Sequence, residues 1–546
     1  MKIQTFKTAI LLVVITLLSN FKSQGQSWTT FSYTATSDTV LDQGTKCVYD
    51  GSGNSYWAGR YYIAQTTRTG YILWKLDRFG VVTVKQVITT GVFGGVLQPI
   101  KDLKVIAGNL YVLFDIKKTV NAIDYDVCTQ KYDFSLVKKW ESIYNNPNSK
   151  DDFGVTLCEG PKSGILTSVS TGQDGGIINN AISNGAIINS YFFGVGNNQK
   201  ESIRKTILTS GGIYFAGKDE SLITGNSDMF ITKVDTNLSL VWNKIFDASG
   251  GAVQDEAIDI NSDASGDILV TGNFVASTGK PRVFYTKYND VNGSRLWIRR
   301  LINDDITAVA VFANSLSNVI SVVNGSPCRY VNINGTSGAI IASKGIFTST
   351  RINYQITDCI NGANDLYITG TFDSTYSVQA NTVLESGVIL SKLDGTGSRL
   401  WNKVYSSTSQ PQYTSSDLAI RGTNRLCFIV NVNDPSVVNK ATHCIFSSIS
   451  TSSGNRIASE TTVPTEITLY PNPAKDFITI RLNKNIEPET LIEIYNYTGQ
   501  LISRNTAYFA TEGSVQTVDI SGLSAGTYLL RIQSGDEQFT QTFIAE

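Results

Sequence analysis

The sequence predicts an all-β protein in which a β-propeller is followed by a second, small β domain. Three observations predict this class. Tyr, Phe, Thr, Ser, Asn and Gly are abundant, whereas the 546 residues include two Met and one His, a balance that favours half-buried strands and tight turns. A strand–turn–strand phrase recurs along the middle of the chain. Near the end, a turn between two prolines introduces a new alternating strand.

Length and charge limit the classes of function. A chain of 546 residues exceeds what one hydrophobic core usually organises, so we expect several domains or a repeat architecture. The net charge is −1 and the pI is about 6.1. This balance lacks the basic surface that nucleic acid or an anionic membrane would require, and we expect neither as a partner.

Residues 1–25 are predicted to form a secretory signal peptide. Lys2 and Lys7 precede an apolar run from Ala9 to Leu18, small and polar residues follow, and cleavage is expected after Gly25. The run is too short for a bilayer anchor, although an uncleaved membrane helix is the alternative. No cysteine follows the run directly, which argues against a lipoprotein. We expect an exported mature chain without a transmembrane segment.

Three phrases form the repeat. They are "ITKVDTNLSLVWNKIF" from Ile231, "YTKYNDVNGSRLWIRRL" from Tyr285 and "LSKLDGTGSRLWNKVY" from Leu390. Each reads as a strand, a turn of Asp, Asn and Gly, and a second strand that carries a tryptophan, which is typical of a β-hairpin. A fourth copy without the tryptophan begins at Arg329.

A second hairpin follows each of these, as in the segments that begin at Ala257 and Gln355. Four short antiparallel strands in a period of roughly 45 to 60 residues are typical of a propeller blade. Weaker units begin near Tyr71, Asn121 and Gly176. The repeats resemble bacterial propeller repeats with a "D-x-x-G-x-x-x-W" hairpin, including those of quinone-dependent dehydrogenases and outer-membrane assembly scaffolds.

The propeller is expected over residues 26–458, with one blade shared between the two ends of the repeat region. A last hairpin begins at Ala441, and its missing half is expected in the segment from Lys46, "KCVYDGSGNSYWAGRYY". Such sharing closes the ring and hides its sheet edges. Seven whole units and the shared one give eight blades, and seven blades is the alternative.

Residues 459–466 form a predicted polar linker, and residues 467–546 form the second domain. Its first segment reads "LYPNPAKDFITIRL", in which Ile478, Ile480 and Leu482 share one face of a strand. The phrases "IEIYNYTGQLI" and "DISGLSAGTYLLRI" follow at ordinary spacing.

Together the three phrases resemble the type A C-terminal sorting domain of the type IX secretion system. The resemblance implies a small Ig-like β-sandwich that the outer-membrane machinery recognises, and a surface sortase that commonly removes it. The chain ends in "QTFIAE" where family members often carry a basic run. The alternative is an ordinary Ig-like accessory module. The motif residues are Tyr470, Pro471, Asn472, Pro473, Gly499, Gly522, Gly526 and Tyr528.

The seven cysteines stand singly, without a CxxC pair or metal-like spacing, and are expected as small buried residues. Cys427 with Cys444 is the one disulfide pairing that we suggest. His443 is the single histidine, so His-ligated metals and His-based triads are hard to build. On a strand its side chain and that of Cys444 point to opposite faces, which disfavours a Cys–His dyad.

Other polar and aromatic repeats favour structural roles. Asp50, Asp263 and Asp394 lie in hairpin turns, where capping of the backbone accounts for them better than calcium binding does. The recurring Trp242, Trp297 and Trp401 are expected between blades rather than in a sugar platform.

We therefore name no catalytic, cofactor-binding or metal-binding residue. The sequence favours a secreted or surface-attached, non-catalytic binding platform whose ligand is an unidentified extracellular glycan or protein. Its further partners are the type IX machinery and its sortase. The alternative is an extracellular carbohydrate-active hydrolase or lyase that uses carboxylates in the propeller channel. A quinone enzyme would need a metal site and adjacent cysteines that the sequence does not display.

Overall fold

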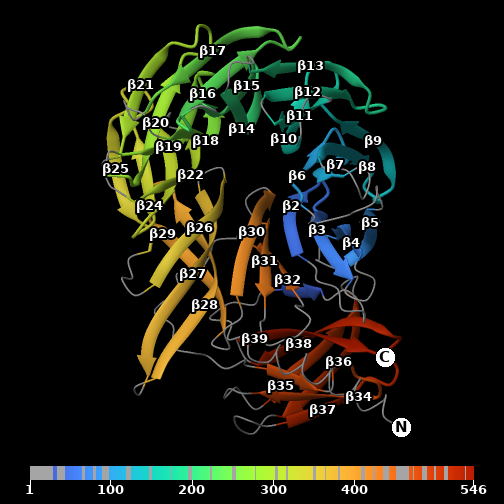
Figure 1. Cartoon of the computed structure of the whole chain (residues 1–546). Helices are drawn as coiled ribbons and strands as arrows, with labels where there is room; N and C mark the ends of the chain where they lie inside the picture. Colours follow the sequence, from blue (N-terminus) through green and yellow to red (C-terminus); the bar gives the residue numbers. More distant parts are fainter. Residues whose placement is uncertain are drawn as a thin grey trace. The chain divides into compact units, whose positions relative to one another are not determined.

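The computed structural model divides the chain into two compact units, Met1–Ser453 and Gly454–Glu546 (Figure 1). The structure describes residues 29–33, 43–63, 68–77, 82–88, 98–117, 124–146, 151–172, 174–194, 199–221, 224–248, 254–276, 278–301, 305–314, 318–347, 352–362, 365–378, 381–407, 412–421, 425–433, 442–450, 467–470, 472–482, 489–496, 500–508, 515–534 and 537–546. Within these residues, every regular element is a strand, and we find no helical segment that could span a bilayer.

The described part of the first unit contains eight four-stranded antiparallel sheets, which we call blades 1 to 8. Blade 1 has β2 (Gln43–Tyr49), β3 (Ser55–Ile63), β4 (Arg68–Leu76) and β5 (Val82–Ile88), and blade 2 has β6 (Asp102–Ile106), β7 (Asn109–Ile116), β8 (Asp126–Tyr132) and β9 (Lys138–Tyr144). Blade 3 has β10 (Phe153–Gly160), β11 (Gly164–Ser170), β12 (Gly175–Ala181) and β13 (Ile187–Phe193), and blade 4 has β14 (Gln199–Thr209), β15 (Gly212–Ser221), β16 (Ser227–Val234) and β17 (Leu240–Phe246).

The remaining blades follow in chain order. Blade 5 has β18 (Asp255–Ser262), β19 (Ile268–Val275), β20 (Pro281–Tyr288) and β21 (Arg295–Arg300), and blade 6 has β22 (Thr307–Ala313), β23 (Val319–Asn324), β24 (Arg329–Ile333) and β25 (Ile340–Gly345). Blade 7 has β26 (Ile352–Asn361), β27 (Asp365–Val378), β28 (Asn381–Asp394) and β29 (Arg399–Ser407). Blade 8 has β30 (Gln412–Arg421), β31 (Arg425–Asn433), β32 (Thr442–Ser450) and β1 (Thr29–Tyr33).

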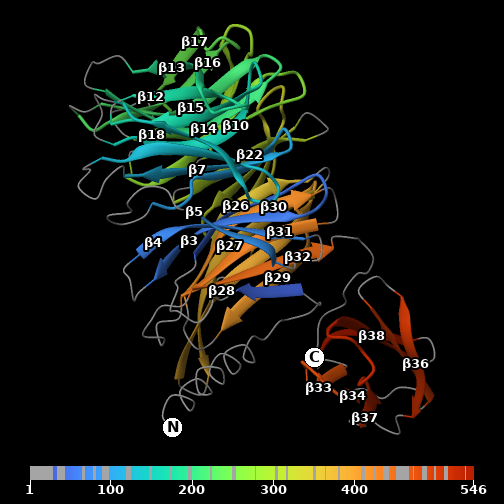
Figure 2. The ribbon, with the colours of Figure 1, turned by 90° about the vertical axis from the view of Figure 1, so that its right-hand side faces the viewer.

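The blades form a closed ring. The first strand of each blade contacts the first strand of the next, from β2 through β26 to β30, and β30 contacts β2 again. Figure 1 shows the sheets following one another around a ring in chain order, and Figure 2 shows the same sheets from the side. Apolar residues from adjacent blades form joint clusters; for example, Tyr71 of blade 1 packs with Phe114 of blade 2. The predicted all-β propeller is confirmed, and the described strands make eight blades.

Closure of the ring differs from our expectation in one respect. The segment from Lys46 does not complete the last blade, because it forms β2 and β3 of blade 1. Instead β1 pairs with β32, from Thr29 opposite Ser448 to Tyr33 opposite Cys444. The C-terminal end of the ring supplies three strands of blade 8, so a single strand fills its open edge.

The same pairing shows where each blade begins and ends along the repeated hairpins. The tryptophan hairpins predicted from Ile231, Tyr285 and Leu390 are β16–β17, β20–β21 and β28–β29. Each lies at the end of a blade, and the hairpin that follows begins the next one. Hairpins repeat along the chain regardless of where one sheet ends, so their recurrence alone does not reveal the boundaries between blades.

The second unit has two antiparallel sheets around one core. The first sheet contains β33 (Ile467–Tyr470), β34 (Phe477–Leu482) and β37 (Val515–Asp519), and the second contains β36 (Leu501–Tyr508), β35 (Glu489–Tyr495), β38 (Gly526–Ser534) and β39 (Glu537–Ala545). Ile478 and Ile480 from the first sheet pack with Ile492, Leu530 and Phe543 from the second. The alternation predicted for "FITIRL" therefore places its two isoleucines in the core.

Candidate functional site

The turn between β33 and β34 holds the last strand of the chain. The Asn472 side chain accepts a hydrogen bond from Ile544 N at 2.9 Å and donates one to Thr542 O at 3.4 Å. Next to it, Ala474 N donates to Ile544 O at 2.8 Å, and Glu546 N donates to Ala474 O at 2.9 Å. The proline-bracketed turn thus fixes the position of β39.

A charged cluster supports the same sheet. Glu493 on β35 is buried, and its carboxylate pairs with Arg504 of β36 and Arg531 of β38. The Tyr495 hydroxyl donates a third hydrogen bond to it at 2.8 Å. Because the two arginines come from strands on either side of β35, the cluster ties three strands together.

In the propeller, tryptophans of the outermost strands join consecutive blades. Trp140 Nε1 donates to Ile182 O at 2.8 Å, and Trp242 Nε1 donates to Asp290 O at 3.0 Å. Trp297 Nε1 donates to Gly335 O at 3.0 Å. Each acceptor belongs to the next blade, and Trp401 packs against a cluster from blades 7 and 8. The predicted role of Trp242, Trp297 and Trp401 between blades is confirmed.

The aspartates of the hairpin turns cap backbone amides. Asp50 Oδ1 accepts hydrogen bonds from Ser52 N and Asn54 N, at 2.8 and 2.9 Å. Asp263 and Asp394 repeat the pattern with the amides two and four residues ahead. The capping that we predicted for these residues is confirmed.

Four aspartates on the first strands of blades connect each of those blades to the next. Each accepts a hydrogen bond from a backbone amide of the following first strand. The pairs are Asp102 with Leu157 N (2.8 Å), Asp259 with Val311 N (2.8 Å), Asp358 with Leu418 N (2.9 Å) and Asp417 with Cys47 N (2.8 Å). Two lysines join this inner layer, since Lys46 pairs with Asp417 at 3.0 Å and Lys205 pairs with Asp259.

Asp358 is the member of this layer with the most unusual acidity. Burial raises the pKa of its carboxyl to about 7; the charge of Asp417 adds to the rise, and Lys46 opposes it. The pKa of Lys46 is raised, first by Asp417. Two carboxylates of adjacent blades therefore interact, but Asp358 already accepts backbone hydrogen bonds from Leu418 N at 2.9 Å and Cys359 N at 2.8 Å.

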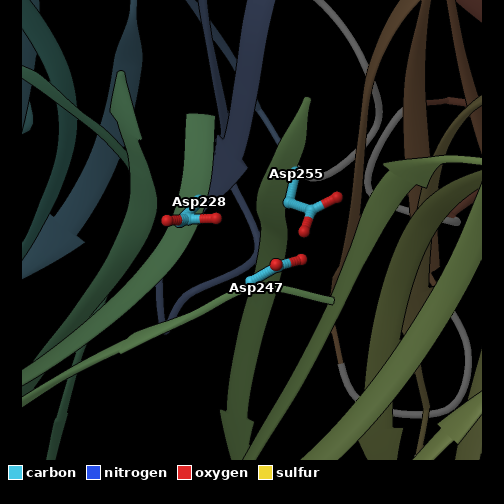
Figure 3. A group of neighbouring side chains, drawn as sticks. All are labelled: Asp228, Asp247 and Asp255. Carbon is cyan, nitrogen blue, oxygen red and sulfur yellow. The ribbon is translucent and has the colours of Figure 1, made fainter. Parts of the chain in front are cut away.

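Three further aspartates lie together at the junction of blades 4 and 5. Asp228 is on β16, Asp247 follows β17, and Asp255 begins β18 (Figure 3). One carboxylate oxygen from each lies within 4.8 Å of the others, a spacing that could hold a cation with oxygen ligands. Burial and then the charge of Asp247 raise the pKa of Asp228. No pattern in the sequence points to this group, because its members are separated by 19 and 8 residues and form no local motif.

The suggested disulfide is wrong. Cys427 and Cys444 lie on paired strands, but Cys444 lies opposite Asn431 in the pairing of β31 with β32. Four residues of strand separate these positions, roughly 13 Å at 3.3 Å per residue, which is beyond the reach of a disulfide. His443 lies opposite Val432. Its side chain and that of Cys444 lie outside the described residues.

The second unit matches a known protein family. Residues 468–546 match the family described as "Secretion system C-terminal sorting domain". This part of the chain is a secretion sorting domain. It agrees with the resemblance to the type IX system drawn from the three sequence phrases, and it means that the protein is secreted or attached to the outer-membrane surface.

The sorting domain places its described motif residues around its last strand and a nearby turn. Asn472 binds β39, and the ring of Tyr528 stacks on that of Phe543 with a centroid distance of 5.7 Å. The Tyr528 hydroxyl donates to Ser524 O at 2.8 Å, which closes the turn before β38. Gly522 lies in the same turn, and Gly526 begins β38.

The remaining motif residues are placed less fully. The peptide bond between Asn472 and Pro473 is cis. Tyr470 ends β33, and its side chain lies outside the described residues, as do Pro471 and Gly499. The motif thus includes both residues that bind β39 and residues of turns.

Several solved structures are similar to this chain. The Dos1 propeller is 12% identical, with 77% of this chain and 94% of that chain covered and a TM-score of 0.45. PorZ, described as an essential bacterial surface component of the type-IX secretion system of Porphyromonas gingivalis, is 11% identical, with 92% and 70% covered and a TM-score of 0.34. Sqt1 from Chaetomium thermophilum is 10% identical, with 76% and 100% covered and a TM-score of 0.44. No curated protein matches the chain.

Proposed function

We propose that the protein is an exported propeller that acts as a non-catalytic binding platform and is delivered by its type IX sorting domain. The sorting-domain match at residues 468–546 supports the proposed export. Residues 1–25 direct the chain to the periplasm, and residues 459–466 link the propeller to an Ig-like sandwich. The partners in transport are the outer-membrane machinery and a surface sortase.

The binding half rests on how the propeller uses its polar residues. The carboxylates of the inner layer accept backbone amides of the following blade, and the turn aspartates cap their own hairpins. These contacts supply stability, and we assign recognition to the loops at one face of the ring, because loops on a rigid scaffold often carry binding residues. The ligand is an extracellular glycan or protein.

Asp358 and Asp417 provide the second candidate, a carbohydrate-active hydrolase or lyase. A carboxyl with a pKa of about 7 beside a second carboxylate has the acidity that a general acid requires. The two backbone hydrogen bonds that Asp358 accepts favour the binding platform over the hydrolase, because a catalytic acid must turn its proton toward a substrate.

Export is tested in the native host with the intact chain and a chain that ends at Thr465. Mass spectrometry of medium, surface and periplasmic fractions should find the intact chain's propeller outside the cell without residues 467–546. The shortened chain should accumulate in the periplasm. Equal export of both chains would refute the role of the sorting domain.

The platform and the hydrolase are separated with purified protein on immobilised and soluble extracellular glycans. The platform predicts retention on a glycan or protein ligand without release of reducing ends, and the same retention for Asp358→Asn. Release of reducing ends that Asp358→Asn abolishes would establish the hydrolase instead.

A further inference from the structure

The junction of blades 8 and 1 brings together residues from opposite ends of the propeller sequence. Asp417 Oδ2 accepts a hydrogen bond from Cys47 N at 2.8 Å, and the two residues are 370 positions apart in the sequence. Gly44 N donates to Asn431 Oδ1 at 3.0 Å, and Asn431 Nδ2 donates back to Gly44 O at 2.9 Å. This junction closes the ring, because β2 belongs to the first blade and β30 and β31 belong to the last.

Two cysteine thiols lie within this junction. Cys47 on β2 is 5% exposed and Cys427 on β31 is 1% exposed, and both belong to one buried cluster with Trp57, Trp74 and Ile429. Cys47 Sγ lies 3.8 Å from Cys427 O. Burial raises the pKa of the Cys47 thiol, and the neighbouring Cys427 adds to the rise. Such proximity of two thiols in an exported protein is the setting in which structural disulfides form.

We propose that Cys47 and Cys427 form a disulfide in the exported protein and lock the propeller ring at its closing junction. The inference rests on the export half of the proposed function, since the cytosol would keep both thiols reduced. One cysteine thiolate attacks a donor disulfide, either of a periplasmic thiol oxidoreductase or of oxidised glutathione, and releases the first donor thiol. The second cysteine thiolate then attacks the mixed disulfide and releases the second donor thiol. The protein loses two protons and two electrons, and the donor is reduced to two thiols.

Oxidation must precede the final packing of the junction. Burial raises the pKa of the Cys47 thiol well above its ordinary range, so the packed thiol is a poor nucleophile. The donor therefore reacts while blades 8 and 1 are still apart. A chain that is already folded and reduced should oxidise much more slowly than a chain that refolds in the presence of the donor.

Trypsin places Cys47, Cys427 and Cys444 in three different peptides. Cleavage after Lys46, Arg60, Arg425, Lys440 and Arg456 gives peptides 47–60, 426–440 and 441–456, which carry Cys47, Cys427 and Cys444. The mature full chain is refolded in a mixture of reduced and oxidised glutathione, alkylated under denaturing conditions and digested without reductant. The proposal predicts peptide 47–60 linked to 426–440. Full alkylation of both cysteines, or a link between 426–440 and 441–456, would overturn it.

The refolding experiment does not depend on export, and the same digest of the host's periplasmic and surface fractions tests the native state. Protein found outside the cytosol with both thiols alkylated would overturn the proposal while leaving export intact. In the wild type, refolding with dithiothreitol instead of the glutathione mixture should lower the thermal midpoint by about 3 °C. The double variant Cys47→Ser/Cys427→Ser should not respond to the reductant, and the control Cys158→Ser, at a partly exposed position of blade 3, should respond as wild type does.

Discussion

The contact between Trp297 of blade 5 and Gly338 of blade 6 offers a quantitative test of how the ring is held together. Gly338 has φ of +68°, and a Cβ atom there would lie 2.6 Å from Trp297 Cδ2. Gly266 has φ of +84° with open space around it. Replacing each glycine by alanine therefore adds the same backbone strain, but only Gly338→Ala also adds a clash with a buried ring.

The two substitutions should differ by the energy of that clash. Alanine in the left-handed region costs about 1 kcal/mol, which is the whole expected effect of Gly266→Ala. Trp297 is 8% exposed and hydrogen-bonded to blade 6, so it cannot move aside freely. Overpacking against such a ring adds about 2 kcal/mol, which brings Gly338→Ala to about 3 kcal/mol.

Urea unfolding followed by tryptophan fluorescence measures these costs, and a double-mutant cycle identifies their origin. Trp297→Ala alone should cost about 4 kcal/mol by leaving a cavity. In its background the additional cost of Gly338→Ala should fall to about 1 kcal/mol, because the clash is gone. Equal costs for Gly338→Ala and Gly266→Ala, or no coupling in the cycle, would refute the proposed inter-blade packing.

Three further outcomes are expected. The folded-state pKa of Asp358 is raised from 3.8 to about 7, so its ionisation opposes folding as the pH rises through that interval. Asp358→Asn should therefore raise the thermal midpoint increasingly from pH 4 to pH 7, and a pH-independent change would contradict this. Glu493→Gln should lower the melting temperature of the sorting domain, since Arg504 and Arg531 lose their shared carboxylate; calorimetry that shows no change would argue against the cluster. Asn472→Ala should cost the sorting domain about 1 kcal/mol and reduce surface delivery in the fractionation assay, whereas normal delivery would show that the hold on β39 is dispensable.

Much of the architecture could be predicted because it is encoded locally. The hairpin phrases that contain Trp242, Trp297 and Trp401 each span about 16 residues, and their turn residues specify the conformation of the backbone. The three phrases of the sorting domain are also local, and the family match agrees with them. Residues that act within one hairpin, such as the capping Asp50 and Asp394, were interpreted correctly for the same reason.

The positions at which the sheets end could not be predicted. Trp-bearing hairpins look alike in sequence whether they begin or end a blade. Where each blade ends is decided by the pairing of β1 with β32, two strands from opposite ends of the propeller sequence. The same limit explains the wrong pairing of Cys427. Its nearby thiol is Cys47, which lies 380 residues away and is brought close only by closure of the ring.

The all-β class, the repeated hairpins and the sorting domain follow from the amino-acid sequence alone, because strand alternation, turn chemistry and short motifs depend on neighbours along the chain. The strand that closes the ring, the aspartates that join the blades and the thiols that lie close together become apparent once the chain is folded. Those contacts depend on the closed circle of eight described sheets, in which hydrogen bonds and buried surfaces join residues that share no local pattern.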